Sequence, residues 1–222
     1  MEIKLLNHGS IRLIESMGND LSIVRSARVS YNADWRTGED EGKDEKLIAY
    51  LMKNRHTTPF ESVVFTFEVK APIFVFRQWH RHRTWSFNEI SARYSELPEE
   101  FYIPQRAHIT QQSKDNKQAR TAEQHSHSQY IQAYIEKTGL AAFAQYKEFL
   151  EIGCPRELAR SILPVGTYSK MFATVDLHNL FHFLRLRLHE HAQYEIRVYA
   201  EAMLELIEPI VPIAVKYFKE TL

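Results

Sequence analysis

Residues 77–94 read RQWHRHRTWSFNEISARY and form the densest polar stretch of the chain. They hold four arginines, two tryptophans and no lysine. The choice of arginine is informative because a guanidinium group binds phosphate or carboxylate as a fork, whereas an ammonium group acts as a point charge. On a helix continuing from Pro72, Gln78, Arg81 and His82 share one face, and the tryptophans would lie beside a flat anionic ligand. A solvated basic helix end, favoured by the macrodipole, explains the same charges without a ligand.

The composition around this stretch is that of a globular protein. Of 222 residues, 44% are hydrophobic and 25% charged, and 28 Lys and Arg balance 28 Asp and Glu. A neutral chain has no overall field that draws it to nucleic acid or to an anionic membrane. No apolar run reaches the roughly 20 residues that span a bilayer, and the first residues lack the apolar run of a signal peptide. We therefore expect a cytoplasmic protein that binds neither nucleic acid nor membrane.

Glycine and cysteine are both scarce. None of the seven glycines forms a G-x-G-x-x-G or Walker A loop, so side-chain cations would have to bind any phosphate group. The single cysteine, Cys154, lies between Gly153 and Pro155, and no base is placed beside it by the sequence. This argues against a nucleophile, and a lone cysteine excludes an intrachain disulfide and a cysteine-based zinc site.

Hydrophobic periodicity and turn residues predict one α+β domain over residues 1–222, with a small, mostly antiparallel sheet and long helices. Strands are expected in a hairpin over residues 2–15, at 63–70 and at 165–175. Helices are expected from a cap at Asp20 to about residue 28, at 46–55, 73–83, 119–152 with an interruption near Gly139, 155–160 and 176–189, and as a pair over 190–220. The segment 33–46 is expected to be a loop, and 104–128 an exposed polar insertion.

A second group of functional candidates follows Asp176, which can cap the helix over 176–189. His178 and His182 are four residues apart and so lie on one helical face. Arg187 falls on the apolar stripe of Leu180 and Phe183, which predicts that its side chain points inward. An inward charge needs a partner, and a structural ion pair would satisfy it. Arg160 repeats the pattern beside Leu163.

Two other functions fit parts of these patterns. His178 and His182 have the spacing of two zinc ligands, but position 179 is Asn where the H-E-x-x-H motif of metalloproteases needs Glu. We therefore expect no metal, although a histidine-based metallohydrolase stays an alternative. The arginines and tryptophans of 77–94 also suit a single-stranded nucleic-acid binder, against which the neutral charge and the inward Arg187 argue.

The stretch resembles a known signature. Arg81-His82-Arg83, followed after seven residues by Ser91, with Asn88-Glu89 between and Arg93-Tyr94 following, is similar to the RHR-x7-S motif of flavin-dependent thymidylate synthases, the ThyX family. Further segments resemble the family in the right order: ARVS at 27–30, HTTPFE at 56–61, PRELAR at 155–160 and HAQYE at 191–195. The resemblance covers residues 1 to about 206.

The resemblance implies a homotetramer whose active sites are assembled between subunits. It implies that dUMP is converted to dTMP with FAD as cofactor, methylenetetrahydrofolate as carbon donor and NADPH as reductant. The family's FAD contacts map onto Ser30, Thr58, Arg81, His82, Arg83, Glu89, Asp176, His178 and His182. Its dUMP contacts map onto Gln78, Arg81, Glu89, Ser91, Ala92, Arg93, Arg160 and Arg187. Arg187 would be the catalytic residue, stabilising charge as the uracil ring ionises, and no cysteine would act as nucleophile.

Overall fold

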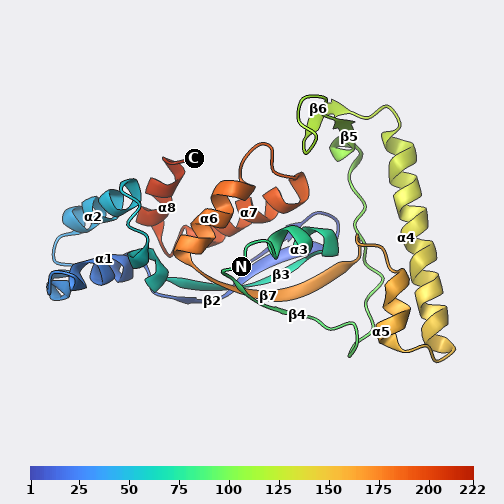
Figure 1. The fold of residues 1–222 in the computed structure, drawn as a ribbon, viewed down its shortest axis with the longest axis horizontal. Helices are drawn as coiled ribbons and strands as arrows, with labels where there is room; N and C mark the ends of the chain where they lie inside the picture. Colours follow the sequence, from blue (N-terminus) through green and yellow to red (C-terminus); the bar gives the residue numbers. More distant parts are fainter.

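A five-stranded antiparallel sheet runs through the centre of the computed structural model, which describes residues 1–222 (Figure 1). Its strands, in spatial order, are β1 (Glu2–Leu5), β2 (Gly9–Met17), β3 (Val64–Pro72), β7 (Tyr168–Asp176) and β4 (Ser86–Glu89). The helices are α1 (Asp20–Val29), α2 (Glu41–Lys53), α3 (Ile73–Trp79), α4 (Ser128–Glu151), α5 (Arg156–Ala159), α6 (Leu177–Arg187), α7 (Tyr194–Ile207) and α8 (Pro212–Lys219). This confirms the predicted α+β class with a small antiparallel sheet.

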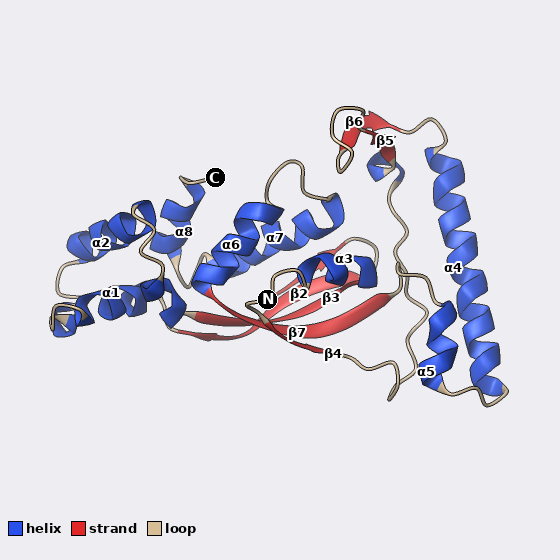
Figure 2. Cartoon of the chain, viewed as in Figure 1, coloured by secondary structure: helices blue, strands red, loops and turns tan.

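The sheet has one buried face and one polar face because its strands alternate. In β3, Phe65, Phe67 and Val69 are fully buried, whereas Thr66 and Glu68 point to the other side. Figure 2 shows helices α6, α7 and α8 lying together on one side of the sheet, and the core of 34 buried residues includes side chains from both. Burying one Phe side chain stabilises the fold by about 1.5–3 kcal/mol.

Helix α4 stands away from the sheet, with the short helix α5 beside it and a two-stranded hairpin, β5 (Thr110–Gln112) and β6 (Arg120–Gln124), near its start (Figure 1). A separate small core of Phe101, Phe143, Tyr146 and Ala159 holds this part together. The predicted interruption near Gly139 is wrong. Helix α4 is continuous, and Gly139 is where the Phe101 ring packs so closely that a Cβ atom would overlap it.

Several predicted boundaries are corrected. Helix α2 begins inside the expected loop, at Glu41, because Asp40 caps it by accepting a hydrogen bond from the Lys43 N–H at 3.1 Å. Residues 120–124 form a strand and not the start of a helix. Helix α3 ends at Trp79, so Arg81 and His82 follow the helix and do not share its face with Gln78. Strand β4, within the polar stretch, was not predicted at all.

The helix caps are partly as expected. Asp176 caps α6, as predicted, by accepting a hydrogen bond from the Asn179 N–H at 2.9 Å. At α1 the cap is Asn19 and not Asp20. The Asp20 carboxylate is buried instead and accepts hydrogen bonds from the first residues of α8, at Ile213 and Ala214. The last two helices and the turn between them follow the prediction. No helix is both long and apolar enough to cross a membrane.

Candidate active site

Arg187 turns inward from the last turn of α6, as its place on the apolar stripe predicts. The side chain is half-buried, and its Nε donates a hydrogen bond to His82 Nε2 at 3.1 Å. Its Nη2 donates to the backbone carbonyl of Gln78 at 3.3 Å. No carboxylate pairs with it, so a structural ion pair does not explain why this guanidinium lies here. The arrangement leaves an inward positive charge uncompensated.

His82 is a neutral partner for that charge. Burial, the nearby charge of Arg187 and then His182 together lower the pKa of His82 from 6.5 to about 4. At neutral pH its imidazole is therefore uncharged, and Nε2 acts as the acceptor. Burial also lowers the pKa of Arg187, yet an arginine stays protonated at any working pH. The pair thus carries one full positive charge.

A chain of side-chain hydrogen bonds continues from Gln78 into the core. Gln78 Nε2 donates to Gln193 Oε1, and Gln193 Nε2 donates to Glu195 Oε2 at 2.8 Å. The Glu195 carboxylate is 2% exposed and also accepts hydrogen bonds from Tyr102 at 3.0 Å and Arg120 at 2.6 Å. Arg120 lies on β6, so this chain ties the polar insertion to the residues around Arg187.

The sequence reasoning assigned no role to Gln193, Glu195, Tyr102 or Arg120. Burial alone would raise the pKa of the Glu195 carboxyl, but the hydrogen bond and charge of Arg120 outweigh it and hold that pKa below its usual range. One signal could have pointed here. Glu195 precedes the buried Ile196 and Tyr199 on α7, and an acid on the buried side of a helix needs a partner.

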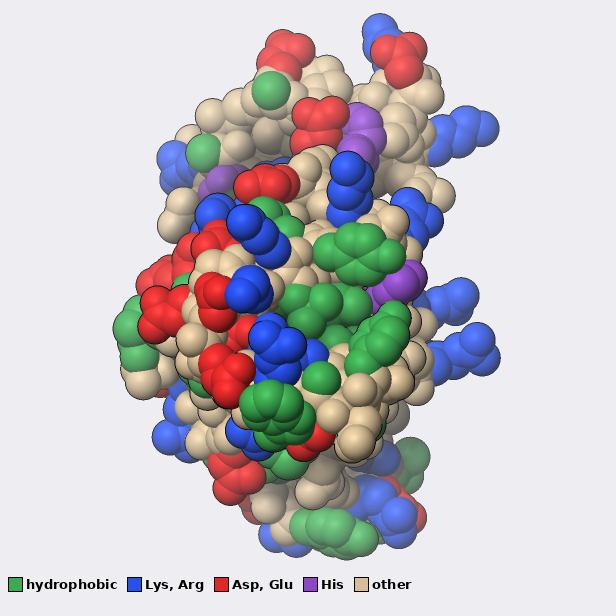
Figure 3. Space-filling view, turned by 90° about the vertical axis from the view of Figure 1, so that its left-hand side faces the viewer, with side chains coloured by type: hydrophobic (Ala, Val, Ile, Leu, Met, Phe, Trp, Pro, Cys, Tyr) green, Lys and Arg blue, Asp and Glu red, His purple; other side chains and the backbone are tan.

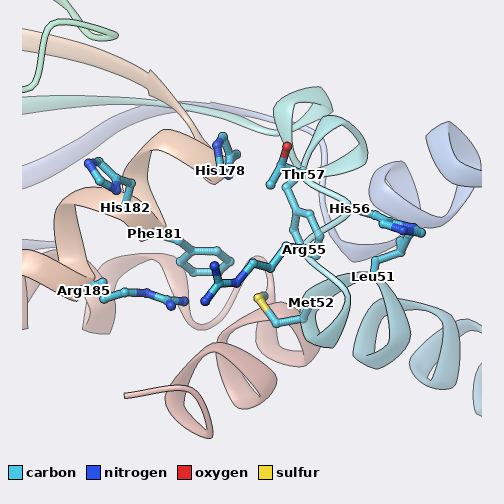
Figure 4. Close-up of a pocket in the computed structure, with 10 residues that line it drawn as sticks. Leu51, Met52, Arg55, His56, Thr57, His178, Phe181, His182 and Arg185 are labelled. Atoms are coloured by element: carbon cyan, nitrogen blue, oxygen red, sulfur yellow. The ribbon is translucent and has the colours of Figure 1, made fainter.

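A cavity of about 380 Å³ lies between the end of α2 and helix α6 (Figure 4). Its ten lining residues are Leu51, Met52, Arg55, His56, Thr57, Phe60, His178, Phe181, His182 and Arg185. Two of the predicted FAD contacts, His178 and His182, therefore line it, and Thr57 lines it where Thr58 was expected. The His182 ring lies 6.0 Å from the His82 ring, centroid to centroid, so the cavity adjoins the Arg187 cluster.

Ser30 lies outside this cavity, at the end of α1. The end of the molecule formed by α1 and α2 carries exposed aromatic side chains, Tyr31, Trp35 and Tyr50 among them. Figure 3 shows hydrophobic side chains gathered in the middle of this end, with acidic and basic side chains around them. The predicted flavin contact at Ser30 thus lies on an exposed surface of this chain.

The remaining arginines of the predicted site are exposed. Arg81 and Arg83 follow α3, and Arg93 pairs with Glu157 of α5 at 3.2 Å across a surface salt bridge. The expectation that Arg160 points inward is wrong, because its short turn after α5 leaves the side chain exposed. Both Arg93 and Arg160 therefore face solvent near α5.

The other predicted dUMP contacts lie along β4 and the turn that follows it. Glu89 Oε1 accepts a hydrogen bond from the Ser169 hydroxyl at 2.6 Å, across the pair of strands β4 and β7. Ser91 Oγ accepts one from the Arg93 N–H at 3.3 Å, which closes a turn at these residues. Ala92, within this turn, is buried.

The tryptophans of the polar stretch have a structural role. Trp79 is fully buried and stacks on Phe183 with ring centroids 4.9 Å apart, and Trp85 is 6% exposed in the same core. The expectation that they flank a flat ligand is wrong, and buried rings offer no stacking surface to the bases of a nucleic acid. No group of three or more His, Cys, Asp or Glu side chains is placed to hold a metal ion.

Comparison with known proteins decides the family. The family model described as thymidylate synthase complementing protein matches residues 12–213. A flavin-dependent thymidylate synthase of Treponema denticola is 50% identical over 98% of this chain and 82% of that protein. The chain belongs to the flavin-dependent thymidylate synthase family. Its relative in Thermus thermophilus is 49% identical over 100% of this chain and 80% of its own length.

A solved structure agrees with this assignment. The UMP/dUMP methylase PolB of Streptomyces cacaoi, bound to 5-Br dUMP, superposes with a TM-score of 0.88 at 37% identity, covering 98% of this chain and 97% of that one. The predicted family, fold class and enzyme class are thus confirmed. In this member of the flavin-dependent thymidylate synthase family, the signature arginines Arg81 and Arg83 are exposed, whereas Arg187 is half-buried.

Proposed function

We propose that this protein methylates dUMP to dTMP with FAD as cofactor, methylenetetrahydrofolate as carbon donor and NADPH as reductant. The observation that carries the proposal is the half-buried Arg187, whose guanidinium has no carboxylate partner in a chain of this family. A positive charge held in this way is available to an anion that forms during a reaction. The named functions of the relatives supply the reaction, and the polar cluster supplies a residue suited to it.

Arg187 would stabilise negative charge on the uracil ring as the ring ionises. Its neutral hydrogen-bond partners, His82 and the Gln78 carbonyl, orient the guanidinium without cancelling its charge. A carboxylate in the place of His82 would form a buried ion pair and remove that charge from the site. The pKa of His82, lowered to about 4, keeps the imidazole neutral over the whole physiological range.

The residues around the cavity fit a flavin dinucleotide. The cavity volume falls within the roughly 300–1,000 Å³ of small-molecule sites, and its walls combine apolar side chains such as Phe60 and Phe181 with imidazole and guanidinium groups. When bound, FAD supplies the hydride chemistry that lets the reaction proceed without a protein thiol. His178 and His182 would hold the flavin from the cavity wall, with Ser30, Thr58, Arg81, Arg83, Glu89 and Asp176 as further contacts.

The exposed arginines would bind the dUMP phosphate. With no glycine-rich loop in the chain, Arg93 and Arg160 supply the forked donors that a phosphate dianion needs. Both are exposed in one protomer, so a strong site requires burial by something else. We infer that a homotetramer in the cytoplasm provides it, with Gln78, Arg81, Glu89, Ser91 and Ala92 completing the dUMP pocket between subunits.

The test is a visible absorption spectrum of the purified protein, followed by addition of NADPH and dUMP. We expect flavin absorption that bleaches with NADPH, and dTMP as the product when methylenetetrahydrofolate is present. UMP is assayed in parallel because the PolB neighbour is named for both nucleotides. A folded protein that is colourless and cannot be reconstituted with FAD would refute the proposal, and light scattering tests the tetramer.

A further inference from the structure

Two arginines outside the predicted site point into the cavity beside α6. Arg55 follows α2, Arg185 lies on α6, and Figure 4 shows both guanidinium groups reaching toward the space beneath Phe181. Both side chains are exposed and also line an adjoining cavity of about 490 Å³, whose walls include Lys53 and Glu220. No Asp or Glu lines the first cavity. Two like charges turned into one acid-free space repel each other, and an anion between them would relieve that repulsion.

Arg55 has a left-handed backbone conformation, which is unusual for an arginine. At the end of α2, the N–H of Arg55 donates to the Met52 carbonyl and the N–H of His56 to the Leu51 carbonyl, which is a Schellman motif. The residue at this position of the motif is usually glycine, because φ is positive there, and Arg55 has a φ of 55°. A Cβ atom is disfavoured in this conformation, yet the Arg55 side chain makes no hydrogen bond or ion pair within the chain that would offset the strain.

Arg185 is held in place without being neutralised. Its Nη2 donates to the Thr221 hydroxyl at 3.0 Å, and its guanidinium carbon lies 5.9 Å from the centre of the Phe218 ring. Both contacts orient the group and leave its charge unpaired. The macrodipole favours a basic residue in the last turn of a helix, which accounts for Arg185 in part. It does not account for a second guanidinium, that of Arg55, which reaches the same space from the turn after α2.

We propose that Arg55 and Arg185 form a phosphate subsite for a dinucleotide, with the apolar wall of Leu51, Phe60 and Phe181 beside it for a ring of the same ligand. Guanidinium forks bind phosphate oxygens bidentately, and a pyrophosphate presents enough oxygens for both groups. The subsite rests on the proposed function, because FAD and NADPH are the two dinucleotides that function requires. Both carry a pyrophosphate, and NADPH carries a further phosphate.

The test uses Arg55→Gly, Arg185→Gln and the double variant, with Arg25→Gln as the matched control. Arg25 is an exposed arginine of α1 that lines neither cavity. Arg55→Gly puts the preferred residue in the left-handed position, so its melting temperature should equal or exceed that of the wild type. Arg185→Gln removes the charge at an exposed position of α6 and costs at most the one hydrogen bond to Thr221. Loss of binding in these variants would therefore reflect the missing charge and not a failure to fold.

Binding is measured by calorimetry on protein stripped of nucleotide, with inorganic pyrophosphate, FAD and NADP⁺ as separate probes. We expect pyrophosphate binding to weaken about 10- to 100-fold for each arginine removed and to be unchanged in the control. A matching loss for FAD with NADP⁺ unchanged identifies the flavin as the source of the phosphate, and the reverse identifies the reductant.

The outcomes separate the two proposals. If the wild type makes dTMP but the double variant binds all three probes as tightly as the wild type, the subsite is wrong and the proposed function stands. If the double variant loses pyrophosphate while the wild type forms no dTMP with FAD present, the subsite stands and the proposed function is wrong.

Discussion

Arg187 and the two arginines near α5, Arg93 and Arg160, differ in how firmly the folded chain holds their side chains. Arg187 is half-buried and held by two hydrogen bonds. A chain of three further side chains, Gln78, Gln193 and the buried Glu195, supports the residues around it. Arg160 is exposed, and Arg93 makes only a surface salt bridge with Glu157. A residue that stabilises a transient charge benefits from a geometry fixed before the reaction. The contacts of a residue that binds a phosphate can form when the ligand binds. We call the residues around Arg187 the oriented region, and Arg93 and Arg160 near α5 the open region.

The largest effect on turnover is expected at Arg187, whose side chain is held by two hydrogen bonds. Arg187→Ala should lower kcat for dTMP formation by about 10²- to 10³-fold, which is the usual cost of losing one preorganised charge donor. FAD should remain bound, because Arg187 does not line the cavity. Steady-state kinetics and the flavin spectrum measure both quantities, with the exposed Arg77→Ala as the control. Equal kcat in Arg187→Ala would remove the proposed difference between the two regions.

The neutral state of His82 makes the oriented region sensitive to acid. Because its pKa is about 4 in the folded protein against 6.5 ordinarily, the unfolded chain binds a proton first as the pH falls. The stability from neutral His82 is therefore complete above about pH 6.5 and is lost as the pH falls toward 4, by up to about 3 kcal/mol.

Urea unfolding at several pH values measures that dependence. In His82→Gln the free energy of unfolding should fall less between pH 6.5 and 4 than in the wild type, by the contribution that His82 makes. In Arg187→Ala the pKa of His82 should rise, because the Arg187 charge is the second cause of its shift. An NMR titration of the ring follows this directly. A His82 pKa near 6.5 in the wild type would contradict the buried arrangement.

The two regions also differ in how well the sequence predicts them. The inward turn of Arg187 follows from helical spacing alone, since residues 180, 183 and 187 share a face. Its partner His82 lies 105 positions earlier, and no local pattern reveals that distance. The segments that resemble the family include Arg93 and Arg160, but the end of a four-residue helix decides that Arg160 faces outward. The prediction for Trp79 and Trp85 is wrong for a similar reason, because the composition of the polar stretch does not show which of its side chains pack into the core.

The open region should affect substrate binding more than turnover. Arg160→Ala should weaken dUMP binding by about 10- to 150-fold, the equivalent of one charge-assisted hydrogen bond of about 1.5–3 kcal/mol. Its kcat at saturating dUMP should change far less than in Arg187→Ala. Equilibrium titration with dUMP and the split between KM and kcat check this. Unchanged dUMP affinity would show that Arg160 does not reach the phosphate.

A smaller effect is expected at the far end of the hydrogen-bond chain. Glu195→Gln keeps the shape of the side chain but puts an amide beside Tyr102, Arg120 and Gln193, so at least one buried group loses its partner. We expect the free energy of unfolding to fall by about 1–3 kcal/mol. We also expect kcat to fall by less than in Arg187→Ala, because Gln78 keeps its backbone bond to Arg187. Glu136→Gln, the same substitution at an exposed residue of α4, is the control for the loss of one charge.

The smallest effect should come from the one residue that a covalent mechanism would need. Cys154 lies in the part of the molecule built around α4 and α5, where it packs against the small core of Phe101 and Phe143. It is half-buried, and Arg187 and the cavity residues do not contact it. Cys154→Ala removes one sulfur atom from this packing, so the free energy of unfolding should fall by about 1 kcal/mol or less. Turnover should stay within a few-fold of the wild type, because the proposed mechanism assigns the charge that assists the reaction to Arg187. Loss of dTMP formation in a Cys154→Ala protein that still melts cooperatively and binds FAD would instead place the chemistry on the thiol, and the half-buried guanidinium would then need another explanation.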